Sequence, residues 1–356
     1  WEVSKFRYPG FYLPWCFWDF RRGVELPYID IGKYNASLDT GRLRSVEGIG
    51  PLVNTSIVNF RNYARANNID GLAGYQQLDI HTYDALQTLM YVEFATLDVQ
   101  SVMQGLTTES YGVESHVATV AEETTNRIVV SSATASNYRV GQTISVGTSR
   151  YGTQVFYGRE IIDIEDYDAE NRAIVFNGDP ANIEVGNLLQ NTGAIGGFSK
   201  KIAASSGSIG DNTSGKYPCM YRGLENPFGS VWQFVDGVNI DDNQAWVCKD
   251  AEQYASNLFA GSAYEMLGYK NHNSDGYVRE MGFDPTLPFA EFPVTVGGSS
   301  TTYYGDYYYQ TTGQRIAHGG GGGADGAPAG PSFWGLYATS SGASVSIGGR
   351  LLKKPL

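Results

Sequence analysis

The chain has 356 residues, of which 42% are hydrophobic and 17% are charged, so it is long enough for roughly two domains and too apolar for global disorder. Its net charge of −12 and its isoelectric point near 4.8 argue against a nucleic-acid partner bound through phosphates and against adhesion to anionic lipid. The sequence contains no apolar run of about 18 residues and no charged-then-apolar leader, so we expect neither a membrane span nor a signal peptide.

Residues 1–53 mix aromatic residues with prolines, which forbid a continuous helix and favour short strands or loops, with one strand in YIDIGKY. A first helix is predicted over about 55–67, with Asn54 or Thr55 as its N-cap. A second helix is predicted over about 81–99, because apolar residues recur there at three- and four-residue spacing. These apolar positions are Leu86, Leu89, Met90, Phe94 and Leu97.

Residues 113–196 are rich in β-branched residues and lose the helical periodicity. Two short motifs repeat at one constant offset: NRIVVS at 126–131 is matched by NRAIVF at 171–176, and a Val-Gly pair at 140–141 is matched by one at 185–186. Each copy predicts a strand, a loop and a turn that leads into another strand. We therefore expect a small β-barrel or sandwich, inserted between the helices and the C-terminal half.

Two acidic stretches could be taken for calcium loops, DYDAEN at 166–171 and NIDDNQ at 239–244. The first lacks the glycine spacing and the terminal glutamate of an EF-hand, so solvation of a hairpin explains it better, and calcium stays unassigned. The acidic run around this first stretch consists of Asp163, Glu165, Asp166, Asp168 and Glu170.

The C-terminal half begins after a Ser/Gly-rich stretch at 199–216, which predicts an exposed loop. Regular structure resumes in SVWQFVDGVNI, whose alternation predicts a core strand. The chain thus divides into residues 1–112, the β-rich insert 113–196 and residues 197–356. The two faces of the predicted strand carry Val231, Gln233 and Val235, and Trp232, Phe234 and Asp236.

The stretch from His318 to Arg350 closes the chain and opens with a run of five glycines. Glycine loses more backbone entropy on folding than any other residue, so this run cannot drive its own ordering. The SVSIGGRLL that follows predicts a short final strand, so an earlier part of the chain must hold the segment. The segment is therefore either a flexible tail or a displayed surface.

Six blocks carry a resemblance to a known family: GKYNAS, SVEGIGPLVNTSIVNFRNYAR, YDALQTLMYVEFATLDVQS, YRGLENPFGSVWQFVDGVNI, GGSSTTYYGDYYYQTTGQRIAHGG and a terminal SIGGRLL. In this order they resemble a group of phage and prophage virion proteins with a C-type-lectin-like domain of the formylglycine-generating-enzyme-like branch. Some of these relatives are the variable proteins of diversity-generating retroelements, whose C-terminal segments are mutagenised to alter ligand binding. The resemblance covers most of the chain outside the β-rich insert.

The resemblance implies an α+β fold, a C-type-lectin-like domain with two N-terminal helices and an inserted small all-β domain. Its last segment would return to pair with the N-terminal strands, and the stretch 318–350 would be displayed on a rigid sheet. Because the front half of this stretch is rich in Gly, Ala and Pro, we expect a flat contact surface rather than a deep sugar pocket. The implied scaffold residues are Trp232, Gly319, Gly320, Trp334 and Arg350. The implied ligand-binding residues are His318, Ala324, Asp325, Ala327, Pro328, Pro331, Ser332, Phe333, Tyr337, Thr339, Ser341 and Ser344.

Catalytic patterns are sparse. The enzymatic relatives of the family use a pair of C-terminal cysteines, whereas no cysteine follows Cys248 here, and Cys16, Cys219 and Cys248 favour buried free thiols. The histidines form no HExxH or Ser-His-Asp pattern, and the glycine run lacks the GK[ST] of a phosphate loop. We therefore predict that the protein is not an enzyme, and we assign it no catalytic residue, metal or cofactor. The histidines are His81, His116, His272 and His318.

Three functions stay open, and we favour the first. The first is a virion adhesin that presents its closing surface to a host-cell glycan or protein. The alternative is a structural head-fibre or capsid decoration protein, and an enzyme of the formylglycine-generating type is the least favoured, because the C-terminal thiols are missing. The resemblance implies contacts with other virion proteins and a homo-oligomer, with a trimer as the expected state. We expect no nucleic-acid partner and no membrane insertion.

Overall fold

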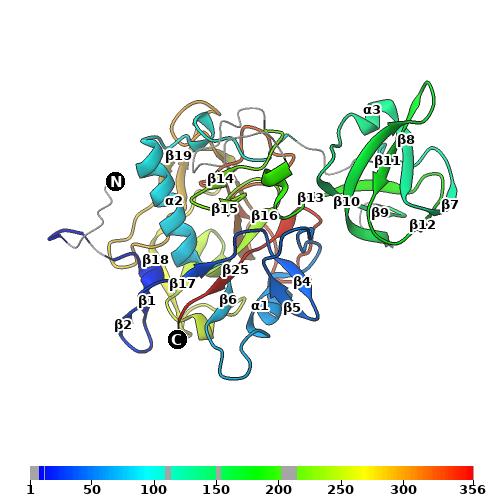
Figure 1. The fold of residues 1–356 in the computed structure, drawn as a ribbon. Helices are drawn as coiled ribbons and strands as arrows, with labels where there is room; N and C mark the ends of the chain where they lie inside the picture. Colours follow the sequence, from blue (N-terminus) through cyan, green and yellow to red (C-terminus); the bar gives the residue numbers. More distant parts are fainter. Residues whose placement is uncertain (1–7, 12, 109–113, 150–153, 202–214, 356) are drawn as a thin grey trace.

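The computed structural model describes residues 8–11, 13–108, 114–149, 154–201 and 215–355. Strands account for 37% of the structure and helical residues for 12%, and the sheets are curled. Figure 1 shows a large body from which a smaller β-rich unit projects on the right. The protein is therefore mostly β in structure.

The predicted α+β class is wrong, although helices form near both predicted places. Helix α1 spans Ile57–Arg65, α2 spans Ile80–Phe94, and α3 (Ser132–Ala135) is a single turn. Helix α2 ends earlier than predicted because Ala95 adopts a left-handed conformation, with a φ of 53°. The class prediction gave two short helices too much weight against many short strands.

Both helices begin at a side chain that accepts a hydrogen bond from the first turn. Ser56, rather than Asn54 or Thr55, is the N-cap of α1, and its hydroxyl accepts from the Asn59 N–H at 3.3 Å. Asp79 caps α2 through Thr82, at 2.9 Å.

A nine-stranded sheet forms the centre of the large body. Its strands run in the spatial order β18, β17, β16, β22, β23, β21, β19 and β20, and β24 pairs in parallel with β16. The closing segment thus contributes β23 and β24 to the sheet. The bounds are β16 (Trp232–Asp241), β17 (Gln244–Cys248), β18 (Tyr264–Lys270), β19 (Gly276–Met281), β20 (Pro293–Val296), β21 (Tyr307–Gln310), β22 (Gln314–Gly319), β23 (Trp334–Leu336) and β24 (Ile347–Gly348).

The two faces of this sheet belong to two separate hydrophobic cores. On β16, Phe234 packs in the core that contains α1, whereas Val235 packs in the core that contains α2. Ile316 and Ala317 of β22 alternate in the same way, as expected for a strand buried on both faces. The predicted alternation on β16 breaks after Val235, because Gly237 adopts a φ of 80° where the register against β22 shifts.

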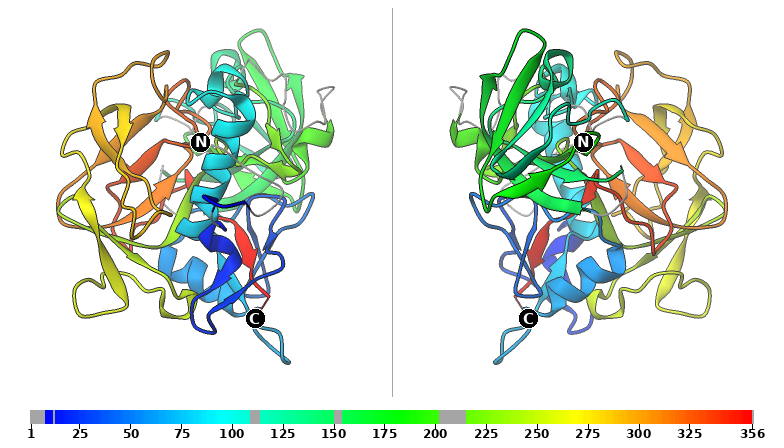
Figure 2. Two further views of the ribbon diagram at one scale, coloured as in Figure 1. Left: turned by 90° about the vertical axis from the view of Figure 1, so that its left-hand side faces the viewer. Right: turned by 90° about the vertical axis from the view of Figure 1, so that its right-hand side faces the viewer.

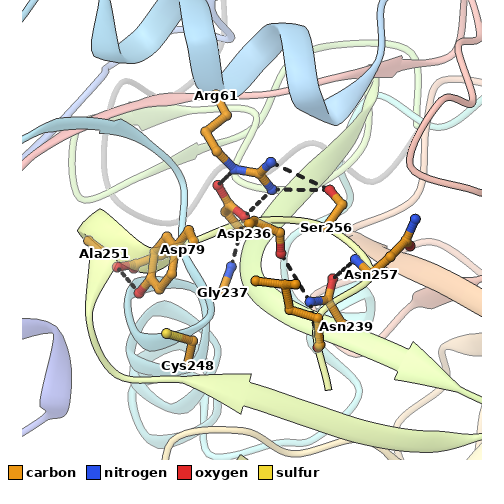
Figure 3. A network of polar contacts seen from close by, with 12 residues as sticks. Arg61, Asp79, Asp236, Gly237, Asn239, Cys248, Ala251, Ser256 and Asn257 are labelled. Atoms are coloured by element: carbon orange, nitrogen blue, oxygen red, sulfur yellow. Dashed lines mark hydrogen bonds and ion pairs between the residues drawn. The ribbon is translucent and has the colours of Figure 1, made fainter. Parts of the chain in front are cut away.

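A buried ion pair fixes α1 to the sheet. Arg61 donates from Nε and Nη2 to the two carboxylate oxygens of Asp236, at 2.8 and 2.7 Å. Figure 3 shows this contact, with Ser256 beside the guanidinium and the Gly237 N–H donating to the same carboxylate. Because both charges are removed from water, loss of either partner would leave the other buried and unpaired.

The C-terminal strand returns to the N-terminal part of the chain. β25 (Leu351–Lys353) lies between β3 (Asp30–Ile31) and β6 (Tyr75–Gln77) and is antiparallel to both. Figure 2 shows this red strand among the blue N-terminal segments. The other short elements are β1 (Trp18–Asp19), β2 (Val24–Glu25), β4 (Ser37–Asp39), β5 (Arg42–Arg44), β14 (Met220–Tyr221), β15 (Leu224–Glu225), and the 3-10 helices η1 (Trp15–Phe17), η2 (Val99–Ser101), η3 (Phe198–Lys201) and η4 (Ala251–Gln253).

The projecting β-rich unit has its own five-stranded sheet, in the order β13, β9, β10, β11 and β8, and its own hydrophobic core. The two copies of the repeated motif lie side by side in it. β8 pairs with β11, and β9 pairs with β13, so that the strands of one copy pair with their counterparts. The bounds are β7 (Glu122–Thr125), β8 (Arg127–Ser131), β9 (Gln142–Gly147), β10 (Gln154–Asp166), β11 (Asn171–Phe176), β12 (Ala181–Ile183) and β13 (Leu188–Ala194).

Most of the predicted exposed loop at 199–216 lies outside the described residues. Within the described part of the chain, the helices are too short and too polar for any of them to span a bilayer.

Candidate functional site

The structure divides the closing segment into a buried part and an exposed part. Residues 318–323, 329–336 and 347–350 are buried, and we call them the frame. Residues 324–328 and 337–344 are exposed or half-buried, and we call them the rim.

The glycines at the start of the frame let the backbone lie directly against neighbouring side chains. A Cβ on Gly319 would lie 2.5 Å from the hydroxyl oxygen of Tyr83, and one on Gly321 would lie 2.7 Å from the Cβ of Ala329. Gly320 and Gly321 also have φ values of 91° and 70°, which side chains rarely allow. The glycine run is therefore packed into the protein and is not a flexible tail.

Three residues of α2, spaced four apart, hold the middle of the frame. The hydroxyl of Tyr83 and the side-chain amide of Gln87 donate to the Pro331 carbonyl oxygen, at 3.0 and 3.1 Å. The hydroxyl of Tyr91 forms a hydrogen bond with that of Ser332. Residues four apart lie on one side of a helix, so α2 presents a polar stripe to the frame.

Arg350 fixes the end of the frame. Its side chain is 1% exposed, and burial lowers the pKa of the guanidinium to about 10. It donates six hydrogen bonds, which tie the C-terminal segment to the N-terminal part of the chain and to the turn before β16. The acceptors are the carbonyl oxygens of Gly32, Lys33, Glu225 and Asn226 and the side chains of Asn35 and Gln233.

The rim surrounds an open pocket of about 400 Å³. Trp232 opens β16, Tyr309 lies in β21, and Tyr337 follows β23, so the pocket lies over strands at the centre of the sheet. The expected flat contact surface is therefore wrong, because the small side chains of the rim leave a hollow between larger ones. The remaining lining residues are Asp325, Ala338, Gly342, Ala343, Ser344, Ser346 and Ile347.

A cluster of aromatic rings in tilted and edge-to-face contact forms the base of this pocket. The ring of Trp232 lies 4.3 Å from that of Phe333 and 4.8 Å from that of His318, measured between centroids. Tyr337 packs edge-on against His318 at 4.7 Å, and Tyr309 meets Tyr337 at 6.1 Å. Phe333 and His318 are buried, whereas Tyr309 and Tyr337 are 39% and 38% exposed. The pocket thus has a fixed aromatic base and two tyrosines that reach solvent.

Asp325 is the acidic residue of the pocket lining. Its Oδ2 accepts a hydrogen bond from the Gly322 N–H at 2.7 Å, and it has no ion-pair partner among the described residues. Burial raises the pKa of this carboxyl to about 6, although hydrogen bonds from Gly322 and from the side chain of Trp232 oppose the rise. None of the described residues that line the pocket is a lysine, arginine or histidine. The carboxylate therefore faces an uncharged, partly desolvated space.

The predicted ligand-binding residues fall into two groups. His318, Pro331, Ser332 and Phe333 are buried in the frame, so their predicted display to a ligand is wrong. They are buried because α2 and β16 cover them. Three of the rim residues, Asp325, Tyr337 and Ser344, meet in the pocket. The predicted residues that reach the surface are Ala324, Asp325, Ala327, Pro328, Tyr337, Thr339, Ser341 and Ser344.

The residues implied as scaffold are all buried. Trp232 and Trp334 pack on opposite faces of the sheet. Gly319 and Gly320 lie where the start of the frame packs closely on its neighbours, and Arg350 fixes its end through hydrogen bonds.

Sequence reasoning missed Tyr309, which forms one wall of the pocket. It lies in the stretch DYYYQ, where Tyr307 and Tyr309 alternate with the buried Tyr308. That alternation predicts a strand with two tyrosines on one face, and it could have been used. The other lining residues that were missed are Ala338, Gly342, Ala343, Ser346 and Ile347.

The acidic stretches considered for calcium have structural roles. Asp168 accepts hydrogen bonds from the N–H groups of Glu170 and Asn171, both at 2.8 Å, and so closes the hairpin of β10 and β11. Asp242 accepts from the Gly313 N–H at 2.7 Å. In the part of the chain that the structure describes, no three His, Cys, Asp or Glu side chains are grouped to hold a metal ion.

Neither a protein-family model nor a curated protein sequence matches this chain.

Proposed function

We propose that this protein is a virion adhesin that binds a host-cell glycan or protein through the pocket of the rim. The observation that supports this proposal is the pocket of about 400 Å³ between Tyr309, Asp325 and Tyr337. Aromatic rings supply large contact area at low entropic cost, and a carboxylate beside them fixes the orientation of a polar ligand.

The division between frame and rim also suits an adhesin. Binding residues often lie on loops that a rigid scaffold positions, because such loops change sequence without unfolding the core. Here the rim carries small and polar side chains, while the frame is held by α2 and by Arg350. The resemblance to phage virion proteins supplies the proposed location on the virion and the proposed trimer.

The cysteines do not favour the alternative of a thiol-dependent oxidation enzyme. All three cysteines are buried and unpaired. Burial raises the pKa of Cys16 and of Cys219 to about 12 and that of Cys248 to about 11. Because the thiolate is the reactive form, these residues are poor nucleophiles near neutral pH.

The test is adsorption of virions that carry Tyr309→Ala or Tyr337→Ala in place of the native protein. We expect host-cell adsorption to fall at least about tenfold, because each change removes one wall of the pocket, while the amount of this protein per particle stays constant. Variant Tyr167→Ala, on the exposed surface of the β-rich unit, is the matched control. Loss of the protein from the particles would instead support a structural decoration role, and unchanged adsorption would refute the adhesin proposal.

A further inference from the structure

The chemistry of the pocket identifies a class of ligand, and this step rests on the proposed binding function. Asp325 places a carboxylate at the pocket wall without an ion-pair partner among the described residues. The two half-exposed tyrosines, Tyr309 and Tyr337, present aromatic rings beside it, with centroids 6.1 Å apart and planes at 88°. A carboxylate and two nearly perpendicular rings are the groups that stabilise an organic cation.

The rest of the pocket favours the same charge. No lysine, arginine or histidine lines it among the described residues, so a cationic ligand meets no like charge there. His318 lies beneath Tyr337, but burial lowers its pKa to about 3, so it is neutral at physiological pH. The net charge of −12 attracts cations to the protein as a whole and disfavours anionic ligands.

We propose that the pocket binds an ammonium group, with Asp325 as its counter-ion and the rings of Tyr309 and Tyr337 as its walls. The ligand would be an amino sugar with a free amine or a choline-type headgroup on the host surface. Its remaining atoms would lie against the small residues of the pocket, among them Ser344 and Ser346, whose hydroxyls form a hydrogen bond with each other at 2.8 Å.

Without a ligand, the carboxylate of Asp325 is partly removed from water and has no counter-ion among the described residues. A partly desolvated carboxylate without a cation is unfavourable, which is why burial raises the pKa of Asp325 to about 6. A bound ammonium ion would remove that penalty. The aromatic base of Trp232 and Phe333 keeps the wall in place whether or not the pocket is filled.

The experiment measures binding of four probes to the full-length protein by calorimetry. Choline is compared with its neutral isostere, in which carbon replaces the quaternary nitrogen, and glucosamine is compared with glucose. We expect at least one ammonium probe to bind about tenfold more tightly than its neutral partner. Preference for choline identifies a quaternary headgroup, and preference for glucosamine identifies an amino sugar. Equal affinities within both pairs, or no binding of either ammonium probe, would overturn the inference.

Two variants tie the preference to the named groups. Asp325→Asn keeps the size of the side chain and should abolish the preference, whereas Asp163→Asn removes the same charge from the exposed surface of β10 and should leave it unchanged. Retention of the preference in Asp325→Asn would overturn the assignment of the counter-ion. Circular dichroism checks that both variants are folded.

The affinity for choline, measured over a series of pH values, tests whether the charge of Asp325 contributes to binding. Choline is permanently charged, so its affinity should fall from pH 7 to pH 5 as Asp325 is protonated. The groups that face this carboxyl are the Gly322 N–H, the side chain of Trp232 and Tyr309, and none of them titrates in that range. A flat profile would overturn the role of Asp325.

The inference and the proposed function fail in different ways. If neutral sugars bind and Tyr337→Ala abolishes that binding while Asp325→Asn does not, the pocket is a ligand site but the ammonium inference is wrong. If Tyr309→Ala and Tyr337→Ala leave host adsorption unchanged, the adhesin proposal fails whatever the probes show.

Discussion

The frame and the rim alternate along one closing segment, yet different forces determine their conformations. The frame is fixed by contacts with distant parts of the chain, such as those of Arg350 with Gly32 and Asn226. The backbone of the rim is also held by distant residues, since the Gly326 N–H donates to the Thr107 carbonyl oxygen and the Ser344 carbonyl oxygen accepts from the Asn54 N–H. The side chains of the rim, however, are exposed or half-buried, and several of them line a pocket. The frame therefore holds the position of the rim, and the side chains of the rim contribute less to the buried core than those of the frame do.

Substitutions in the frame and in the rim should therefore have different effects. Changes in the frame should lower the stability of the fold, because they leave buried groups unpaired or overpacked. Changes in the exposed side chains of the rim should alter ligand binding and leave stability almost unchanged, whereas the partly buried carboxylate of Asp325 also affects stability.

The largest effect is expected for Arg350→Met in the frame. This variant keeps much of the side-chain volume but leaves buried acceptors, among them the carbonyl oxygens of Glu225 and Asn226, without a donor. We expect the free energy of unfolding to fall by about 3–5 kcal/mol, or the protein not to fold. Urea denaturation measures the loss. Arg279→Met, at an exposed arginine, is the control and should change stability by less than about 1 kcal/mol. A small loss in Arg350→Met would show that the frame does not depend on this residue.

The next effect is expected for Gly335→Ala in β23. The added Cβ would lie 2.3 Å from Nε2 of His318, whose ring is held between Trp232 and Tyr337. Overpacking of this kind costs about 1–3 kcal/mol, which thermal or urea unfolding detects. In Gly342→Ala in the rim, the added Cβ would lie 3.0 Å from the Thr339 carbonyl oxygen, with its next neighbours at 3.5 and 3.6 Å, so this change should cost less.

Combining Gly335→Ala with His318→Ala tests whether the clash with His318 causes the loss of stability. If the clash with His318 is the cause, then His318→Ala should tolerate Gly335→Ala better than the native protein does, with a coupling free energy of about 1 kcal/mol. Additive losses would assign the cost of Gly335→Ala to another contact.

Sequence reasoning located the main elements of the fold but misjudged their proportions. The alternation in SVWQFVDGVNI predicted β16, and the repeated motifs predicted strands that the structure pairs with each other. The extent of α2 was wrong because Leu97 continues the apolar pattern while Ala95 ends the helix in a left-handed conformation. Such a local backbone change is set by packing and leaves no periodic signal.

The candidate site was harder to predict for a related reason. Phe333 is a large aromatic residue in a loop-rich stretch, which predicted display, but its burial depends on contacts with Trp232 from a distant strand. The hydrogen bonds of Tyr83 and Gln87 on α2 were not predicted, because their acceptor is a backbone carbonyl group of a distant segment. Periodicity identifies apolar faces, and it does not identify the partners of buried polar groups.

In the rim, Tyr337→Leu should separate binding from stability. The tyrosine ring is 38% exposed, and leucine can retain part of its contact with His318. We expect the free energy of unfolding to change by less than about 1 kcal/mol, while affinity for the ammonium probe falls about tenfold. Urea unfolding and calorimetry on the same sample measure the two quantities. A loss of stability as large as that of Gly335→Ala would place Tyr337 in the frame.

The only gain in stability is expected for Asp325→Asn. The folded-state pKa of about 6 lies above the ordinary value of 3.8, so the folded protein holds this proton more tightly than the unfolded chain does. Ionisation therefore destabilises the native protein as the pH rises through the window between these two values. The variant has no such penalty. The difference of about 2 pKa units corresponds to at most about 3 kcal/mol, so at pH 7 the variant should be more stable than the native protein by about 1–3 kcal/mol, with the difference vanishing near pH 3. Unfolding measured at both pH values tests this. A variant that is less stable at pH 7 would show that the carboxylate strengthens the fold, and the residue that binds ligand would then belong to the frame as well as to the rim.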